Sequence, residues 1–299
     1  MFLLHAHAAE EVRGVVAFLE HVLLSSIIEL LTLLPFLFLT YLLMEFIEHR
    51  ASDKAERFMK KAGPLGPAVG GLLGAVPQCG FSAAASNLFA GRVVTVGTLV
   101  AVFLSTSDEM IPILISSDIP VWKALLFVLY KAVVAVAVGF AVDLSLRIAK
   151  KGERKINIDE LCEKDECHCE KGILHSAIHH TITISLFVFA VTFAINTAIF
   201  FIGEESLGLV MNDLPVLSHL VAAIVGLVPN CASSVLLATL YSGGIISVGT
   251  MLSGLFSGAG VGLLVLFRVN RHIKENLLIV LILILAGVGF GLLGELIFA

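Results

Sequence analysis

The sequence predicts an all-α, polytopic membrane protein built from two repeats of inverted topology, and three observations carry this prediction. Of its 299 residues, 58% are hydrophobic and 14% are charged, and the mean hydropathy is +1.00. A soluble domain is much less apolar than this. Several apolar runs reach the roughly 20 residues with which a helix crosses a bilayer. The third observation is an internal duplication.

The duplication appears when the chain is slid along itself by 152 positions. Leu65–Leu144 then aligns with Leu217–Leu296 without a gap. The pairs in register include Gly74 with Gly226, Pro77 with Pro229, Cys79 with Cys231, Ser82 with Ser234, and Asp143 with Glu295. Shared apolar composition would match leucine with leucine, but it would not align proline, cysteine, serine and glycine together. We therefore interpret the two halves as copies of one unit.

Each copy carries an apolar segment that a proline interrupts, about Leu65–Ala90 in the first and about Val216–Tyr241 in the second. Each arm has about 12 residues, or ~18 Å as helix, which is short of the ~30 Å hydrocarbon core. We expect re-entrant helical hairpins, because this topology places the basic loops on one side, the cytoplasm. Glu48–Lys61 holds five Lys and Arg and Arg147–Lys171 holds seven, whereas Gly203–Pro215 holds none.

Three membrane spans accompany each hairpin, so the second half is expected to enter the membrane in the opposite orientation. The predicted domains are a first transmembrane repeat (1–146), a cytoplasmic linker (147–172) and a second, inverted repeat (173–299). Both termini are expected outside, and counting hairpin arms separately gives about ten helices. The expected spans are about Val22–Phe46, Val93–Ile115, Trp122–Leu146, Ile173–Ile202, Ile246–Phe267 and Leu277–Phe298.

The hairpin tips are the first candidate site. Proline breaks the helix and frees backbone groups, which survive at membrane depth only inside protein or beside a wet cavity. Amides and thiols at the breaks could bind a substrate where the two tips meet near the midplane. The alternative is a pair of packing kinks with buried thiols. The candidate residues are Pro77, Gln78, Cys79 and Ser82 in the first tip and Pro229, Asn230, Cys231 and Ser234 in the second.

A pair of acids inside the span that follows the first hairpin is the second candidate. Ser105, Ser107, Asp108 and Glu109 lie in one polar stretch, where the second half has mainly glycine and apolar residues. Carboxylates at membrane depth are costly, so they indicate a function such as ligation of a divalent cation or relay of protons. The alternative is a shifted span that leaves both acids near an interface.

Several other polar residues are weaker candidates for function. They are Glu29, Glu45, Asn87, Lys131 and Asn196. Asp143 and Glu295 match each other in the duplication but lie near predicted helix ends. We expect those two carboxylates to be solvated rather than ligands.

The linker is a third candidate, because thiols and an imidazole crowd within eight positions. Cys162, Cys167, His168 and Cys169 suit a borderline or soft metal, which a cytoplasmic linker would sense or collect. Their spacing matches no standard zinc module. A solvated charged loop with incidental cysteines is the alternative.

These motifs together resemble the ten-helix heavy-metal exporters. The resemblance rests on Val76–Cys79, its copy Val228–Cys231, the acidic stretch Ser105–Glu109 and the Cys/His-bearing linker, and it covers almost the whole chain. Prokaryotic members are commonly described as manganese transporters or arsenic efflux proteins. The resemblance implies export across the cytoplasmic membrane, and it leaves the exported ion open between hard manganese and thiophilic arsenic.

The function expected from the sequence is secondary-active export of a divalent or heavy metal ion, with manganese favoured by the oxygen ligands. The alternatives are an exporter of arsenicals or of another anionic or organic substrate, and a membrane metal sensor. No nucleotide-binding motif is present, so protons are the expected coupling ion. The other partners expected are the metal-ion substrate and the lipid bilayer, without nucleic acid, and a homodimer is one possible assembly. No cofactor should be required beyond a metal on the linker, and an enzyme is not expected.

Overall fold

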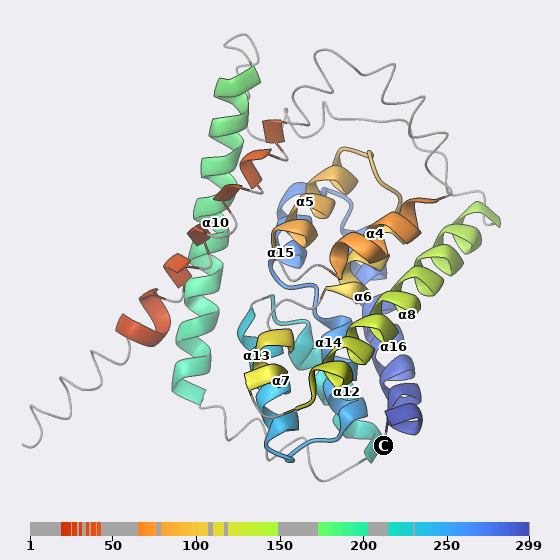
Figure 1. The fold of residues 1–299 in the computed structure, drawn as a ribbon. Helices are drawn as coiled ribbons and strands as arrows, with labels where there is room; N and C mark the ends of the chain where they lie inside the picture. Colours follow the sequence, from red (N-terminus) through yellow and green to blue (C-terminus); the bar gives the residue numbers. More distant parts are fainter. Residues whose placement is uncertain are drawn as a thin grey trace, which may run out of the picture.

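The computed structural model describes a set of ranges distributed over both repeats. The ranges are 19–24, 26–28, 30–31, 34–35, 37–39, 41–42, 65–75, 79–106, 110–116, 119–148, 173–202, 215–229 and 231–298. The regular elements within them are helices (Figure 1). These elements are the π-helix η1 (Leu19–Leu24) and the α-helices α4 (Gly66–Gly74), α5 (Cys79–Ala90), α6 (Val96–Ser105), α7 (Met110–Ser116), α8 (Val121–Ile148), α10 (Ile173–Ile202), α12 (Pro215–Gly226), α13 (Cys231–Ser242), α14 (Val248–Ser257), α15 (Val261–Val269) and α16 (Ile273–Phe298).

Four helical stretches in the described ranges are long and apolar enough to cross a membrane. They are Val121–Ile148, Ala177–Ala194, Val248–Val269 and Ile273–Phe298. Large apolar side chains cover the outer faces of α8, α10 and α16; Leu129 on α8, for example, is 59% exposed and Leu285 on α16 is 64% exposed. Such faces are favourable in lipid and costly in water. The chain is accordingly a helical membrane protein.

The duplication predicted from the sequence is visible in the helix boundaries. Helices α5 and α13 begin and end 152 positions apart, and so do α6 and α14. In each repeat the three helices α4, α6 and α8, or α12, α14 and α16, pack on one another. In Figure 1, α8 runs upward to the right, whereas its counterpart α16 runs down to the C-terminus. These two equivalent helices are thus drawn in opposite directions.

The repeats also exchange contacts with each other. Helix α5 of the first repeat packs on α15 of the second, and α13 of the second packs reciprocally on α7 of the first. Figure 1 draws α4, α5 and α15 in the upper half of the bundle and α12, α13 and α7 in the lower half. The central helices α6 and α14 pack on each other as well. One buried apolar cluster runs through both repeats and includes Phe89, Phe103 and Phe256.

The sequence prediction was wrong about the continuity of two spans. The span expected at 93–115 is two helices, because α6 ends at Ser105 and α7 begins only at Met110. The span expected at 246–267 is also divided, between α14 and α15. Gly260 has φ 52° and ψ −147°, a conformation that a helix cannot contain and that glycine adopts most easily. Thr106 leaves the helix with ψ 126°.

The other predicted spans are confirmed where the structure describes them. The helix expected at 122–146 is α8, the one expected at 173–202 is α10, and the one expected at 277–298 is α16. Both proline-interrupted segments are divided into two short helices, α4 with α5 and α12 with α13. Part of the span expected at 22–46 lies outside the described residues.

Candidate functional site

A buried lysine joins the ends of the two central broken helices. Lys131 lies within α8 and its exposed fraction is 0%. Its Nζ donates hydrogen bonds to the carbonyl oxygen of Thr106, the C-cap of α6, and to that of Leu255 in the last turn of α14, at 2.8 Å for the latter. Carbonyls at helix C-termini lack partners within the helix and carry partial negative charge. An ammonium therefore fits this place electrostatically.

The last residues of α4 and α12, the helices that precede the two prolines, lie beside the ends of α6 and α14. A Cβ added at Gly74, the last residue of α4, would lie 2.5 Å from the carbonyl oxygen of Val102 and would also collide with the Ser105 hydroxyl. A Cβ at Gly258, just after α14, would lie 3.4 Å from the carbonyl oxygen of Gly226, the last residue of α12. Helices α4, α6, α12 and α14 therefore end in one region, and each of them belongs to an interrupted segment.

The predicted tip residues divide between those the structure describes and those it does not. Ser82 is fully buried where α5 crosses α15, and the Ser86 hydroxyl spans the crossing with bonds of 2.9 Å to the carbonyl of Ser82 and 2.7 Å to that of Gly262. Pro229 and Ser234 are partly buried at the second tip. Pro77, Gln78 and Asn230 lie outside the described residues, as do the side chains of Cys79 and Cys231, which begin α5 and α13.

The acidic stretch begins at the end of α6. Ser105 is fully buried, and its hydroxyl lies 2.8 Å from the carbonyl oxygen of Ala101 and 3.0 Å from that of Val102. Ser107, Asp108 and Glu109 lie outside the described residues, in the connection from Thr106 to Met110. In the sequence the acids therefore stand between α6 and α7, shortly after Thr106, whose carbonyl Lys131 binds.

The expectation of a solvated Asp143 was wrong. This carboxylate is 8% exposed and caps the start of α6, accepting bonds from the backbone N–H of Gly97 at 2.8 Å and the Thr95 hydroxyl at 2.6 Å. Glu295 does the same for α14, with 2.6 Å bonds from Gly249 N–H and the Ser247 hydroxyl. Carboxylates satisfy the free donors at a helix N-terminus. We call these arrangements the two carboxylate caps.

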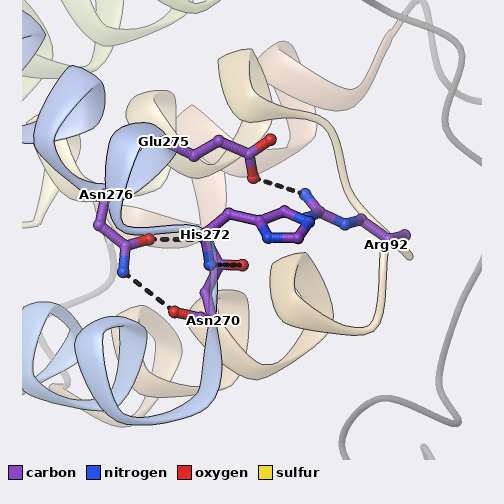
Figure 2. A network of polar contacts seen from close by, with 5 residues as sticks. All are labelled: Arg92, Asn270, His272, Glu275 and Asn276. Atoms are coloured by element: carbon purple, nitrogen blue, oxygen red, sulfur yellow. Dashed lines mark hydrogen bonds and ion pairs between the residues drawn. The ribbon is translucent and has the colours of Figure 1, made fainter.

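An ion pair links the repeats at one end of the bundle (Figure 2). Arg92, in the turn between α5 and α6, donates to the carboxylate of Glu275 on α16 over 2.9 Å. Asn270 and Asn276 hold the turn between α15 and α16 in place, with a 2.6 Å bond between their side chains. At the equivalent positions 152 residues away stand Gly244 and Lys123, which cannot form such a pair. The ion pair therefore forms at the turn after α5 and not at the equivalent turn after α13.

The residues of the linker cluster lie outside the described part of the chain; they are Cys162, Cys167, His168 and Cys169. The part of the chain that the structure does describe contains no group of three or more His, Cys, Asp or Glu side chains placed to hold a metal ion. The linker metal site stays a prediction.

Sequence reasoning missed two features of this centre, although each had a signal. The break between α14 and α15 falls at Gly258 and Gly260, two glycines with one residue between them in an otherwise apolar run. Lys131 was ranked as a weaker candidate, yet it is a charged residue within a 28-residue apolar helix. A charge in such a run indicates a paired, buried role.

The chain matches none of the protein-family models, curated proteins or solved structures with which it was compared. Its function is therefore inferred from its own residues and their arrangement. A centre built from interrupted helices offers carbonyl oxygens, hydroxyls and, in the adjoining connections, carboxylates, amides and thiols. This set can bind a cation inside a membrane.

Proposed function

We propose that the chain is a secondary-active exporter of a divalent metal ion, manganese in the first place, that works by alternating access in the cytoplasmic membrane. The observation that carries the proposal is the meeting of four interrupted segments around the ends of α6 and α14. Interrupted helices from two related repeats, meeting inside the bundle, are the usual design of a transporter binding site.

The ligands of the proposed site come from the breaks themselves. Asp108 and Glu109 follow the end of α6, and Gln78 and Asn230 stand in the two tips. Carboxylate and amide oxygens suit manganese, and two carboxylates balance the charge of a divalent ion. Cys79 and Cys231 would add softer ligands and widen the range of metals. In this proposal the metal ion is the substrate, and the linker thiols collect it on the cytoplasmic side.

The proposed transport cycle uses the relation between the two repeats. If the repeats are inverted in the membrane, the Thr95–Asp143 cap and the Arg92–Glu275 pair lie on the cytoplasmic side, and the Ser247–Glu295 cap lies outside. Movement of one repeat against the other would then open the centre to each side in turn. The Arg92–Glu275 pair would close the cytoplasmic side, since it joins the repeats there.

A metal-tolerance assay tests the proposal. A metal-sensitised host that expresses the protein should tolerate more manganese and contain less of it. Replacing Asp108→Asn together with Glu109→Gln should weaken metal binding roughly 10-fold or more and abolish the tolerance. Asp213→Asn, an acid in the loop before α12, is the matched control and should leave tolerance intact. Full tolerance in the double variant, at equal expression, would show that these acids are not the site.

Export of an arsenical or another anionic substrate is the second candidate, and Lys131 is the observation that favours it. A buried ammonium in the centre could balance an anion, although its two described bonds go to carbonyl oxygens. A panel of Mn, Zn, Fe, Co, Cd and arsenite separates the candidates. Tolerance to arsenite alone that Cys79→Ser with Cys231→Ser removes would favour the arsenical. A membrane metal sensor, in contrast, would lose all function when 162–169 is deleted.

A further inference from the structure

Lys131 occupies a place that the backbone alone makes suitable for a cation. Two helices, α6 and α14, end next to each other, and carbonyls from both ends point at one ammonium. The Phe256 ring centroid lies 5.9 Å from the same Nζ, so an aromatic face adds to the attraction. Each of these features stabilises positive charge, and none depends on the lysine's covalent attachment to α8.

The second repeat shows what the same helix position looks like without the charge. The position 152 residues after Lys131 is Leu283 on α16, which is also fully buried. Leucine there packs in the apolar cluster that runs through both repeats. The equivalent buried position on α16 therefore accepts an apolar side chain, whereas burying an ammonium is costly unless partners compensate its charge. The two carbonyl oxygens contribute to that compensation at Lys131.

We propose that the ends of α6 and α14 form a binding site for a monovalent cation, and that Lys131 fills this site with its own ammonium. Lys131 thus acts as a tethered cation that holds the two interrupted helices together. The stabilising role of Lys131 rests on the packing of the two helices and does not depend on which ion is exported.

Thermal unfolding of the full chain, purified in detergent, tests this proposal without measuring transport. Lys131→Ala removes a propylammonium group and should lower the unfolding temperature by roughly 5 °C or more. Added n-propylammonium should restore most of the loss, because a ligand that binds only the folded state stabilises it. n-Propanol has a similar shape without the charge and should restore little. Leu283→Ala leaves a comparable cavity in the other repeat, and propylammonium should not restore its stability.

Lys131→Met is the second variant, since it keeps the length of the side chain and removes only the charge. It should also unfold at a lower temperature than the wild type, and no added ammonium should restore it because methionine fills the site. An unfolding temperature for Lys131→Met equal to that of the wild type would overturn the proposal. Equal restoration of Lys131→Ala by n-propanol and n-propylammonium would overturn it too, since filling of a cavity would then explain the recovery.

Discussion

Asp143 and Glu295 are equivalent residues whose surroundings differ in one respect. Both accept a bond from the backbone N–H of a glycine 46 residues before them, in the first turn of α6 or α14, and both take a bond from the hydroxyl of an N-cap residue, Thr95 or Ser247. Asp143 is buried at 8% exposure, whereas Glu295 is partly buried. Water can therefore replace the bonds of Glu295 more easily than those of Asp143.

This difference predicts unequal costs for the same substitution. Asp143→Ala leaves the Gly97 N–H without its acceptor in a buried place and should lower the free energy of unfolding by about 1–3 kcal/mol. Glu295→Ala should cost less, because solvent reaches its donors. Denaturation of the purified variants in detergent, side by side, measures both. A larger loss for Glu295→Ala than for Asp143→Ala would be inconsistent with the burial in the structure.

Arg92 takes a backbone conformation that side chains other than glycine's seldom adopt. Its φ is 59°, and the equivalent residue of the second repeat is Gly244 with φ 70°. The conformation belongs to the turn between two helices, and the cost for an arginine is on the order of 1–3 kcal/mol. The ion pair with Glu275 and the contact with the Phe89 ring, 5.3 Å away, offset that cost. The first repeat, which forms the ion pair, carries arginine at this position, whereas the second carries glycine.

At the scale of the elements, the interrupted helices distinguish this fold from a plain bundle. The break between α14 and α15 depends on Gly260, and the residue at the same place in the first repeat is Asp108. The second copy carries a glycine that makes the turn possible, and the first carries an acid at the equivalent place in the sequence, outside the described residues.

Gly260→Ala tests whether the break between α14 and α15 requires glycine. Alanine at φ 52° and ψ −147° should lower the free energy of unfolding by about 1–3 kcal/mol. The matched control is Gly289→Ala on α16, where an added Cβ meets no atom within 4 Å. That change should be neutral or stabilise the helix by about 0.5–1 kcal/mol. Equal stability of Gly260→Ala and the wild type would mean that this backbone conformation is not adopted in solution.

The sequence was sufficient to predict most elements of the fold. Long apolar runs predicted α8, α10 and α16 closely, and the proline in each repeat predicted the division of α4 from α5 and of α12 from α13. The breaks after α6 and α14 were missed because no proline marks them. Serine, threonine and glycine are compatible with a membrane helix as well as with its interruption. Only tertiary packing decides between the two.

The sequence predicted the duplicated tips and the acids from composition and register. Most of those residues lie outside the described ranges, so this part of the site stays a prediction. Lys131 and the two carboxylate caps were undervalued, because their importance depends on which helix ends lie beside them. A carboxylate near a predicted helix end is expected to be solvated. Only the structure identifies the neighbouring helix whose N-terminus it caps, as for Asp143 and α6.

At the scale of the whole molecule, the two copies of the unit carry different charges at several equivalent positions. Examples are Arg92 and Gly244, Lys123 and Glu275, Asp108 and Gly260, and Lys131 and Leu283. Arg92 and Gly244 lie in equivalent turns, and Lys131 and Leu283 are buried at equivalent positions on α8 and α16. The packing of α4, α6 and α8 is repeated in α12, α14 and α16.

Metal flux through the purified protein in proteoliposomes is the most direct test of the proposed function. With a proton gradient across the vesicle membrane, the wild type should move manganese against the direction of proton flow. The Asp108→Asn, Glu109→Gln double variant should show no flux above empty vesicles, and Asp213→Asn should match the wild type. An absence of manganese flux through folded wild-type protein, or equal flux through the double variant, would contradict the proposed metal export.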